Sequence, residues 1–172
     1  MKITAIIVTY NGMQWYDRCF GSLQQSDVPV DIVVIDNASS DGTVAYIKQH
    51  YPAIQVIASK ENLGFAKANN IGMRYALDNG ADYVFLLNQD AWINEKNTIS
   101  SLIKLSKTHT DYAILSPLQL YGSANRIEKE VVSYFSRTAT TTQDFVSDAY
   151  FNRVQDLYEV PYACAVCWLM PI

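Results

Sequence analysis

The chain has 172 residues, of which 49% are hydrophobic and 17% are charged, and its formal net charge is −4. This length and hydrophobic content suffice for a folded domain with its own core, and they exclude a disordered chain. The negative charge argues against a nucleic-acid-binding protein, which needs a basic surface. No apolar run approaches the roughly 18 residues of a membrane span, so we expect a cytoplasmic protein.

Strand-like and helical patterns alternate along the first two thirds of the chain. Continuous apolar runs predict strands, in chain order, at residues 3–9, 31–35, 54–58, 82–87 and 112–115. Between them, apolar side chains at helical spacing predict helices whose stripes start at Tyr16, Val44, Phe65 and Ile99. This alternation predicts an α/β fold: a mostly parallel, Rossmann-like central sheet with flanking helices and a ligand site at the carboxyl ends of its strands.

The last third of the chain departs from this pattern. Residues 133–148 are polar and rich in threonine, which predicts a mobile loop, either a functional lid or acceptor contact or an ordinary surface connection. Residues 162–169 are apolar enough for a buried strand, and because this segment leads directly to the end of the chain we expect the chain to stop short of its natural end. We expect a single domain over residues 1–172, with a nucleotide-binding part at about 1–120 and a partial acceptor-side part at 121–172.

Polar residues follow three of the predicted strands. They are Thr9-Tyr10-Asn11, Asp36-Asn37-Ala38-Ser39 and Asn88-Gln89-Asp90. Asp36 can accept a hydrogen bond from a pyrimidine N–H or a ribose hydroxyl, while Thr9 and Tyr10 can frame a base. Asp90 can hold a divalent cation against a phosphorylated ligand, because hard cations prefer oxygen ligands. Taken singly, each group is equally well explained as a turn.

A phosphate site is predicted at the start of the helix near residue 64. Gly64, Lys67, Asn69 and Asn70 lie on its first turns, just after Asn62, and unpaired N–H groups and the helix dipole at such a start attract anions. Taken alone, Lys67 is equally an ordinary surface lysine. The chain contains neither a Walker A sequence nor Gly-x-Gly-x-x-Gly, which argues against an ATPase or a dinucleotide-binding protein.

Four segments, taken together and in this order, resemble family 2 glycosyltransferases of the GT-A fold, and most closely the rhamnosyltransferase-like branch. The segments are Ile6-Ile7-Val8-Thr9-Tyr10-Asn11, Val33-Val34-Ile35-Asp36-Asn37-Ala38-Ser39-Ser40-Asp41-Gly42-Thr43, Asn62-Leu63-Gly64-Phe65-Ala66-Lys67-Ala68-Asn69-Asn70 and Leu86-Leu87-Asn88-Gln89-Asp90. The resemblance covers most of residues 1–120, and residues 163–171 resemble a family strand near the acceptor site. It implies a GT-A nucleotide-sugar-binding fold.

The resemblance also implies an activity: transfer of a sugar, with inversion, from a dTDP- or UDP-sugar to a glycan or lipid-linked glycan in cell-surface polysaccharide synthesis, aided by Mg²⁺ or Mn²⁺. By position, Thr9, Asn11 and Asp36 would hold the nucleotide, Lys67 would approach the diphosphate and Asp90 would bind the metal. The neighbouring polar residues complete the predicted nucleotide site: Tyr10, Asn37, Ser39, Asn62, Gly64, Asn88 and Gln89.

The chain departs from the family at two points. The family's metal motif is commonly Asp-x-Asp, whereas its first position here is Asn88. The family's general base lies beyond the segment that resembles residues 163–171, so we expect it beyond Ile172 and expect this chain to be a donor-binding fragment.

Other functions remain open from the sequence. A non-catalytic nucleotide-sugar-binding or assembly module is the main alternative. A sugar nucleotidyltransferase is disfavoured because its Gly-rich phosphate loop is missing, and a receiver-like signalling domain would not explain residues 62–70. A lipid-linked acceptor would be compatible with peripheral association at the inner face of the membrane. The apolar final segment would be compatible with self-association into a homo-oligomer.

Overall fold

The computed structural model of the chain describes residues 1–137 and 139–172. These residues form two compact units. One consists of Met1–Leu115 together with Ala165–Ile172, and the other of Ser116–Cys164. In the part of the chain that the structure describes, no helix has the length and apolar character needed to cross a membrane.

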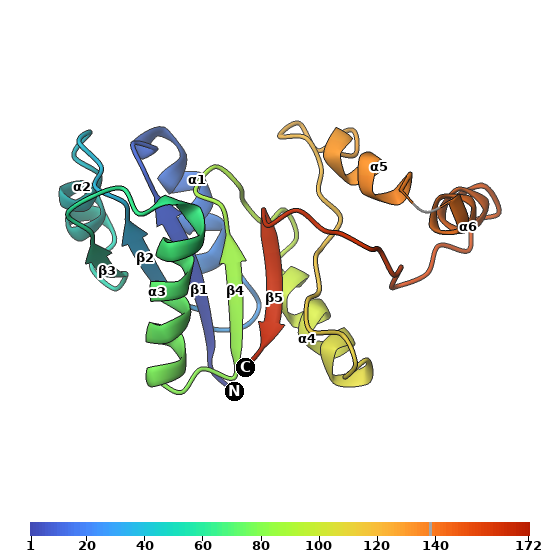
Figure 1. Cartoon of the computed structure of the whole chain (residues 1–172), viewed down its shortest axis with the longest axis horizontal. Helices are drawn as coiled ribbons and strands as arrows, with labels where there is room; N and C mark the ends of the chain where they lie inside the picture. The colour runs from blue at the N-terminus through green and yellow to red at the C-terminus, as the bar shows by residue number, and fades with distance from the viewer. Residues whose placement is uncertain (138) are drawn as a thin grey trace. The chain divides into compact units, whose positions relative to one another are not determined.

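A five-stranded sheet in the order β3-β2-β1-β4-β5 forms the centre of the first unit (Figure 1). The strands are β1 (Ile3–Thr9), β2 (Asp31–Asp36), β3 (Gln55–Ala58), β4 (Tyr83–Leu87) and β5 (Cys167–Pro171). β1 pairs in parallel with both β2 and β4, and β2 pairs in parallel with β3, whereas β5 is antiparallel to β4. The predicted α/β fold with a mostly parallel sheet is confirmed. Parallel strands end at the same edge, so the residues that follow them gather there.

Helices cover both faces of this sheet: α3 lies in front of it in Figure 1 and α1 behind it. The helices of the first unit are α1 (Tyr16–Gln24), α2 (Thr43–His50), α3 (Gly64–Asp78) and α4 (Thr98–Thr108), with a short 3₁₀ helix at Met13–Trp15. The stripe predicted to start at Tyr16 is buried, as its helical spacing requires. Phe65, in contrast, is 48% exposed, so the predicted stripe of α3 is wrong at its first position.

Small residues let α3 lie very close to the sheet. Ala68, Gly72 and Ala76 are buried on its inner face. A Cβ atom added at Gly72 would lie 2.4 Å from Cγ2 of Ile6 in β1, and Ile6 is fully buried. The helix backbone at Gly72 therefore packs directly against the side chain of Ile6, which leaves no room for a further side chain there.

Two strands predicted in the second half of the chain, at residues 112–115 and 162–169, are wrong. Residues 112–115 do not form a strand, and only Leu115 makes a bridge, to Leu169. The predicted strand at 162–169 is displaced, because β5 begins at Cys167 and runs to Pro171. Both segments are apolar, but an apolar run indicates burial and does not identify the residues that have a strand partner.

The second unit contains two helices, α5 (Lys129–Phe135) and α6 (Ala139–Tyr150). The predicted loop at residues 133–148 is therefore wrong, except that Thr138 lies outside the described residues. Threonine lowers helix stability by only a fraction of a kcal/mol per residue, so contacts elsewhere can outweigh it. One such contact is the aromatic pair Phe145 and Tyr158, whose ring centroids are 5.3 Å apart.

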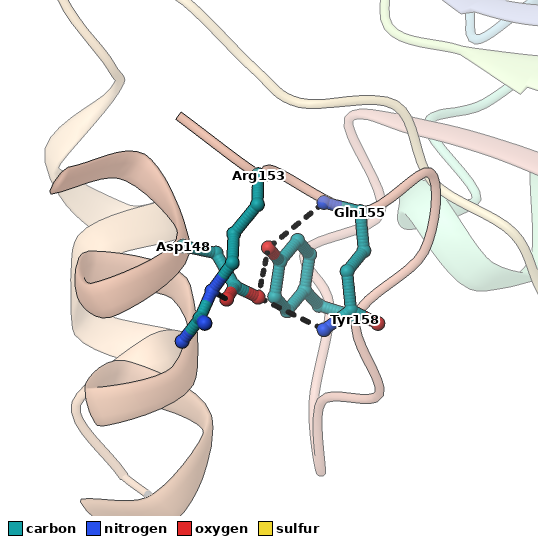
Figure 2. A network of polar contacts seen from close by, with 4 residues as sticks. All are labelled: Asp148, Arg153, Gln155 and Tyr158. Atoms are coloured by element: carbon teal, nitrogen blue, oxygen red, sulfur yellow. Dashed lines mark hydrogen bonds and ion pairs between the residues drawn. The ribbon is translucent and has the colours of Figure 1, made fainter. Parts of the chain in front are cut away.

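A buried carboxylate near the end of α6 fixes the segment that follows the helix (Figure 2). Asp148 is 6% exposed and accepts hydrogen bonds from Arg153 Nε at 2.8 Å and from Gln155 Nε2 and the Tyr158 hydroxyl at 2.9 Å each. The Tyr158 hydroxyl also accepts from the Gln155 N–H at 3.0 Å. The Asp148 side chain thus holds residues 153–158 against the end of α6.

Replacing Asp148 with asparagine is expected to loosen residues 151–158, because the amide keeps the size but loses the charge that strengthens these hydrogen bonds. Gln155, then Tyr158 and Arg153, lower the pKa of Asp148 below its ordinary value. The stabilisation is therefore present above a pH of about 4 and is lost as the pH falls through the lowered pKa.

Hydrogen-exchange protection of residues 151–158 measures this effect. The Asp148→Asn variant should be less protected than the wild type at pH 7, and the difference should shrink on acidification to about pH 2. Asp144→Asn, an exposed change on the same helix, is the control. Equal protection of Asp148→Asn and the wild type at pH 7 would contradict the role of this carboxylate.

Candidate functional site

The candidate site lies at the edge where the parallel strands end, between β1 and β4. From β1 the chain proceeds outward on one side of the sheet through β2 and β3, and then returns to the other side of β1 as β4. At such a switch point the connections leave β1 and β4 in opposite directions, and this is where open α/β sheets bind their ligands.

Asp36 connects the ends of β1 and β2. Its carboxylate accepts from the Thr9 hydroxyl at 3.1 Å and from the Ser39 N–H at 3.1 Å, and the residue is 2% exposed. The Asn11 N–H donates to the Ser39 hydroxyl at 3.0 Å. The Asn11 side-chain oxygen in turn accepts from the Ser40 N–H at 2.8 Å. The predicted residues Thr9, Asn11, Asp36 and Ser39 thus lie together.

A second group of predicted residues joins the end of β2 to the start of α3. Asn37 Nδ2 donates to Asn62 Oδ1 at 2.8 Å, and Asn37 Oδ1 accepts from the Leu63 N–H at 2.7 Å. Asn62 Oδ1 also accepts from the Gly64 N–H at 2.9 Å. Lys67 lies one turn further along and is exposed. The asparagines fix the first turn of α3 at the site.

The end of β4 presents side chains that have no hydrogen-bond or ion-pair partner within the described residues: those of Asn88 and Asp90. Asp90 is exposed and Asn88 is half-buried. The backbone here is well anchored, since the Asn88 N–H donates to the Val166 carbonyl at 2.9 Å and the Asn88 carbonyl accepts from the Ala91 N–H at 3.0 Å. A rigid backbone therefore presents a free carboxylate.

This donor set fits a hard divalent cation as a partial set of ligands. Carboxylate and amide oxygens are the protein ligands that Mg²⁺ and Mn²⁺ prefer, and Mg²⁺ is commonly held by one or two carboxylates together with substrate phosphates and water. Residues 1–137 and 139–172 hold no cluster of three or more His, Cys, Asp or Glu side chains suited to a metal. A cation held by Asp90 and Asn88 would take further ligands from the phosphate oxygens of a ligand and from water.

A network that the sequence did not predict joins Gln89 and Asp41 to the buried side chains of Tyr16 and Thr43. The Tyr16 hydroxyl, in a fully buried residue, is 3.0 Å from the Thr43 hydroxyl and 3.5 Å from Gln89 Oε1, and the Thr43 hydroxyl donates to Asp41. Burial raises the pKa of Tyr16, so its hydroxyl remains a donor. Desolvation acts against ionisation of Asp41, but hydrogen bonds from Thr43 and the Met13 N–H lower its pKa overall.

Tyr16 was assigned only to the buried face of a helix, and that pattern carries no signal for its hydroxyl. The one available signal is its position: a tyrosine in the core stripe, a few residues after a predicted strand end. A tyrosine there can turn its hydroxyl toward the site while its ring fills the core.

Comparison with protein families gives a match over nearly the whole chain. The model of glycosyl transferase family 2 matches residues 4–170. Among curated proteins, the low-salt glycan biosynthesis hexosyltransferase Agl10 of Haloferax volcanii is 36% identical over 116 residues, which are 67% of this chain and 36% of that protein. The O-antigen chain rhamnosyltransferase RfbN of Salmonella typhimurium is 31% identical over 104 residues, 60% of this chain and 32% of that protein. The chain thus spans about a third of the length of these relatives.

Comparison with solved structures supports the fold. The mannosyltransferase PcManGT from Pyrobaculum calidifontis, solved in complex with GDP-Man and Mn²⁺, superposes with a TM-score of 0.62 at 24% sequence identity. The match covers 69% of this chain and 36% of that chain. This likeness concerns the fold alone, and it confirms the predicted GT-A fold.

Proposed function

The chain belongs to glycosyl transferase family 2, and on this premise we propose that it is the donor-binding part of a glycosyltransferase. The reaction is transfer of a sugar, with inversion, from a nucleotide diphosphate donor to a glycan or lipid-linked glycan. The observation that carries the proposal is the gathering of polar residues from three strand ends and the start of α3 at one edge, beside the free carboxylate of Asp90. The relatives' names, which refer to glycan biosynthesis and an O-antigen chain, support a cell-surface glycan as the acceptor.

The nucleoside binds at the ends of β1 and β2 in this proposal. Each oxygen of Asp36 accepts one hydrogen bond from the protein and has a second lone pair for a base N–H or a ribose hydroxyl. Thr9 and Ser39 hold the carboxylate in place. Tyr10 is 47% exposed, so its ring is free to contact the base.

The diphosphate lies between α3 and Asp90 in this proposal. The first turn of α3 offers the positive end of its dipole, although the Leu63 and Gly64 N–H groups are already bonded to Asn37 and Asn62, and Lys67 adds a full charge. Asp90, with Asn88, would hold Mg²⁺ or Mn²⁺, which when bound neutralises the negative charge that grows on the leaving diphosphate. The bound Mn²⁺ of the structurally similar mannosyltransferase supports this choice of ion.

Calorimetry with UDP, dTDP and GDP, each with and without Mn²⁺, tests the proposal. We expect at least one nucleotide to bind, and to bind more tightly with Mn²⁺, because the cation joins the carboxylate to the diphosphate. Inorganic pyrophosphate is the control, and it should bind more weakly because it lacks the nucleoside. A chain that binds none of the three nucleotides, with or without metal, contradicts the proposed function.

A further inference from the structure

The side chain of Gln89 closes the switch point between β1 and β4. Backbone pairing of these strands ends where Ile6 lies opposite Leu86. Beyond that point the Gln89 side chain, rather than the backbone of β4, pairs with the chain that follows β1. The Tyr10 N–H donates to Gln89 Oε1 at 2.9 Å, and Gln89 Nε2 donates to the Tyr10 carbonyl at 3.2 Å. One amide thus satisfies both backbone groups of a single residue, as a neighbouring strand would.

The surroundings of Gln89 leave its amide little freedom to move. A Cβ atom added at Gly12 would lie 2.4 Å from Gln89 Oε1 and 2.6 Å from Cδ, so the Gly12 backbone packs directly against the amide. The Tyr16 hydroxyl makes a weak contact with the same oxygen at 3.5 Å and accepts from the Gly12 N–H at 3.3 Å. The amide is held on two sides.

The Gln89 amide uses one acceptor site and one donor site on the backbone of Tyr10. The oxygen accepts from the Tyr10 N–H, whereas the Tyr16 hydroxyl 3.5 Å away directs its one proton to Thr43, which itself donates to Asp41. Only one of the two N–H groups of Nε2 remains without a described partner. Turning the amide toward a nucleotide or a cation would break both bonds to Tyr10, although the sequence places Gln89 between Asn88 and Asp90.

We infer that Gln89 is a positioning residue, which fixes the metal-binding end of β4 relative to the nucleoside-binding end of β1. The inference rests on the proposed function and assigns Gln89 a role other than direct contact with the nucleotide. One donor molecule must contact both strand ends at once, and the backbone pairing of β1 with β4 stops before it reaches them. A fixed distance between the ends avoids the entropic cost of ordering them when the donor and the cation bind.

The consequence is a coupling between nucleotide and metal that depends on Gln89. Two ligands that share a preorganised site raise each other's affinity by the same factor, typically about 5- to 150-fold. In Gln89→Ala we expect the gain in nucleotide affinity on adding Mn²⁺ to fall about tenfold. The metal-free affinity should stay within about threefold of the wild type, because Asp36 and its partners are untouched.

A second variant disturbs the same two hydrogen bonds, between the Gln89 amide and the Tyr10 backbone, from the side of Gly12. Gly12→Ala leaves Gln89 in the sequence but pushes its amide away from Tyr10, and Gly12 has a φ of −121°, which alanine adopts without strain. It should reproduce the loss of coupling, and the double variant should lose no more than either single variant. Gln24→Ala, an exposed glutamine on α1, is the matched control and should leave the coupling unchanged.

Calorimetry with UDP, dTDP and GDP, with and without Mn²⁺, measures the coupling. Hydrogen exchange of the Tyr10 amide reports directly on its bond to Gln89 Oε1. Faster exchange at Tyr10 together with reduced coupling in either variant supports the inference. Unchanged coupling overturns it, and so does an equal loss of nucleotide affinity with and without Mn²⁺, which would indicate direct contact or general damage. Failure of the wild type to bind any nucleotide is a different outcome, which contradicts the proposed function itself.

Discussion

Replacing Asp90 with alanine is expected to abolish the Mn²⁺ dependence of nucleotide binding while leaving the fold intact. Asp90 is the one carboxylate in the Asn88-Gln89-Asp90 segment, and its side chain is exposed and has no hydrogen-bond or ion-pair partner in the described part of the chain. Loss of a partner that only supports a metal ligand already costs about 10- to 100-fold in affinity, so loss of the ligand itself should cost roughly 100-fold or more.

Titrations with Mn²⁺ at a fixed nucleotide concentration measure this effect, and thermal unfolding checks the fold. Asp78→Ala, an exposed carboxylate at the far end of α3, is the matched control and should bind like the wild type. Asp90→Asn keeps an oxygen ligand but loses the charge, and it should fall between the two. Metal dependence that survives in Asp90→Ala would place the cation elsewhere.

Replacing Gly72 with alanine is expected to destabilise the protein by about 1–3 kcal/mol, although alanine is the better helix former. The new Cβ would lie 2.4 Å from Cγ2 and 3.2 Å from Cγ1 of Ile6, which is fully buried in the central strand β1. Ile6 is surrounded by other core residues, so either the strand or the helix must move.

The same substitution in α1 should have the opposite sign. A Cβ atom added at Gly21 meets nothing within 4 Å, so Gly21→Ala gains the helix propensity of alanine without a clash. We expect this variant to be more stable by up to about 1 kcal/mol. Chemical denaturation of both variants measures the two free energies of unfolding. A stabilised Gly72→Ala would mean that α3 moves away from β1 at little cost.

Much of the fold follows from local sequence patterns. Residues 3–9 were predicted as a strand, and β1 has these bounds, because a run of apolar residues of this length is buried on both faces in a parallel sheet. The helix at Gly64 begins where it was predicted. The second unit was predicted less well, since the threonines of α6 favour other structures locally, whereas its stability comes from contacts such as those of Asp148 with residues that follow the helix.

The sequence by itself determined the four parallel strands, their ends and the residue types that gather there, because parallel strands deliver their last residues to one edge whatever the details of packing. Only the tertiary structure decided what each of these side chains contacts. Gln89 and Tyr10 are separated by 79 residues, and Tyr16 and Thr43 by 27 residues. Hydrophobic periodicity reports which side of an element is buried. It carries no information about the distant partner that a polar group on that side will meet.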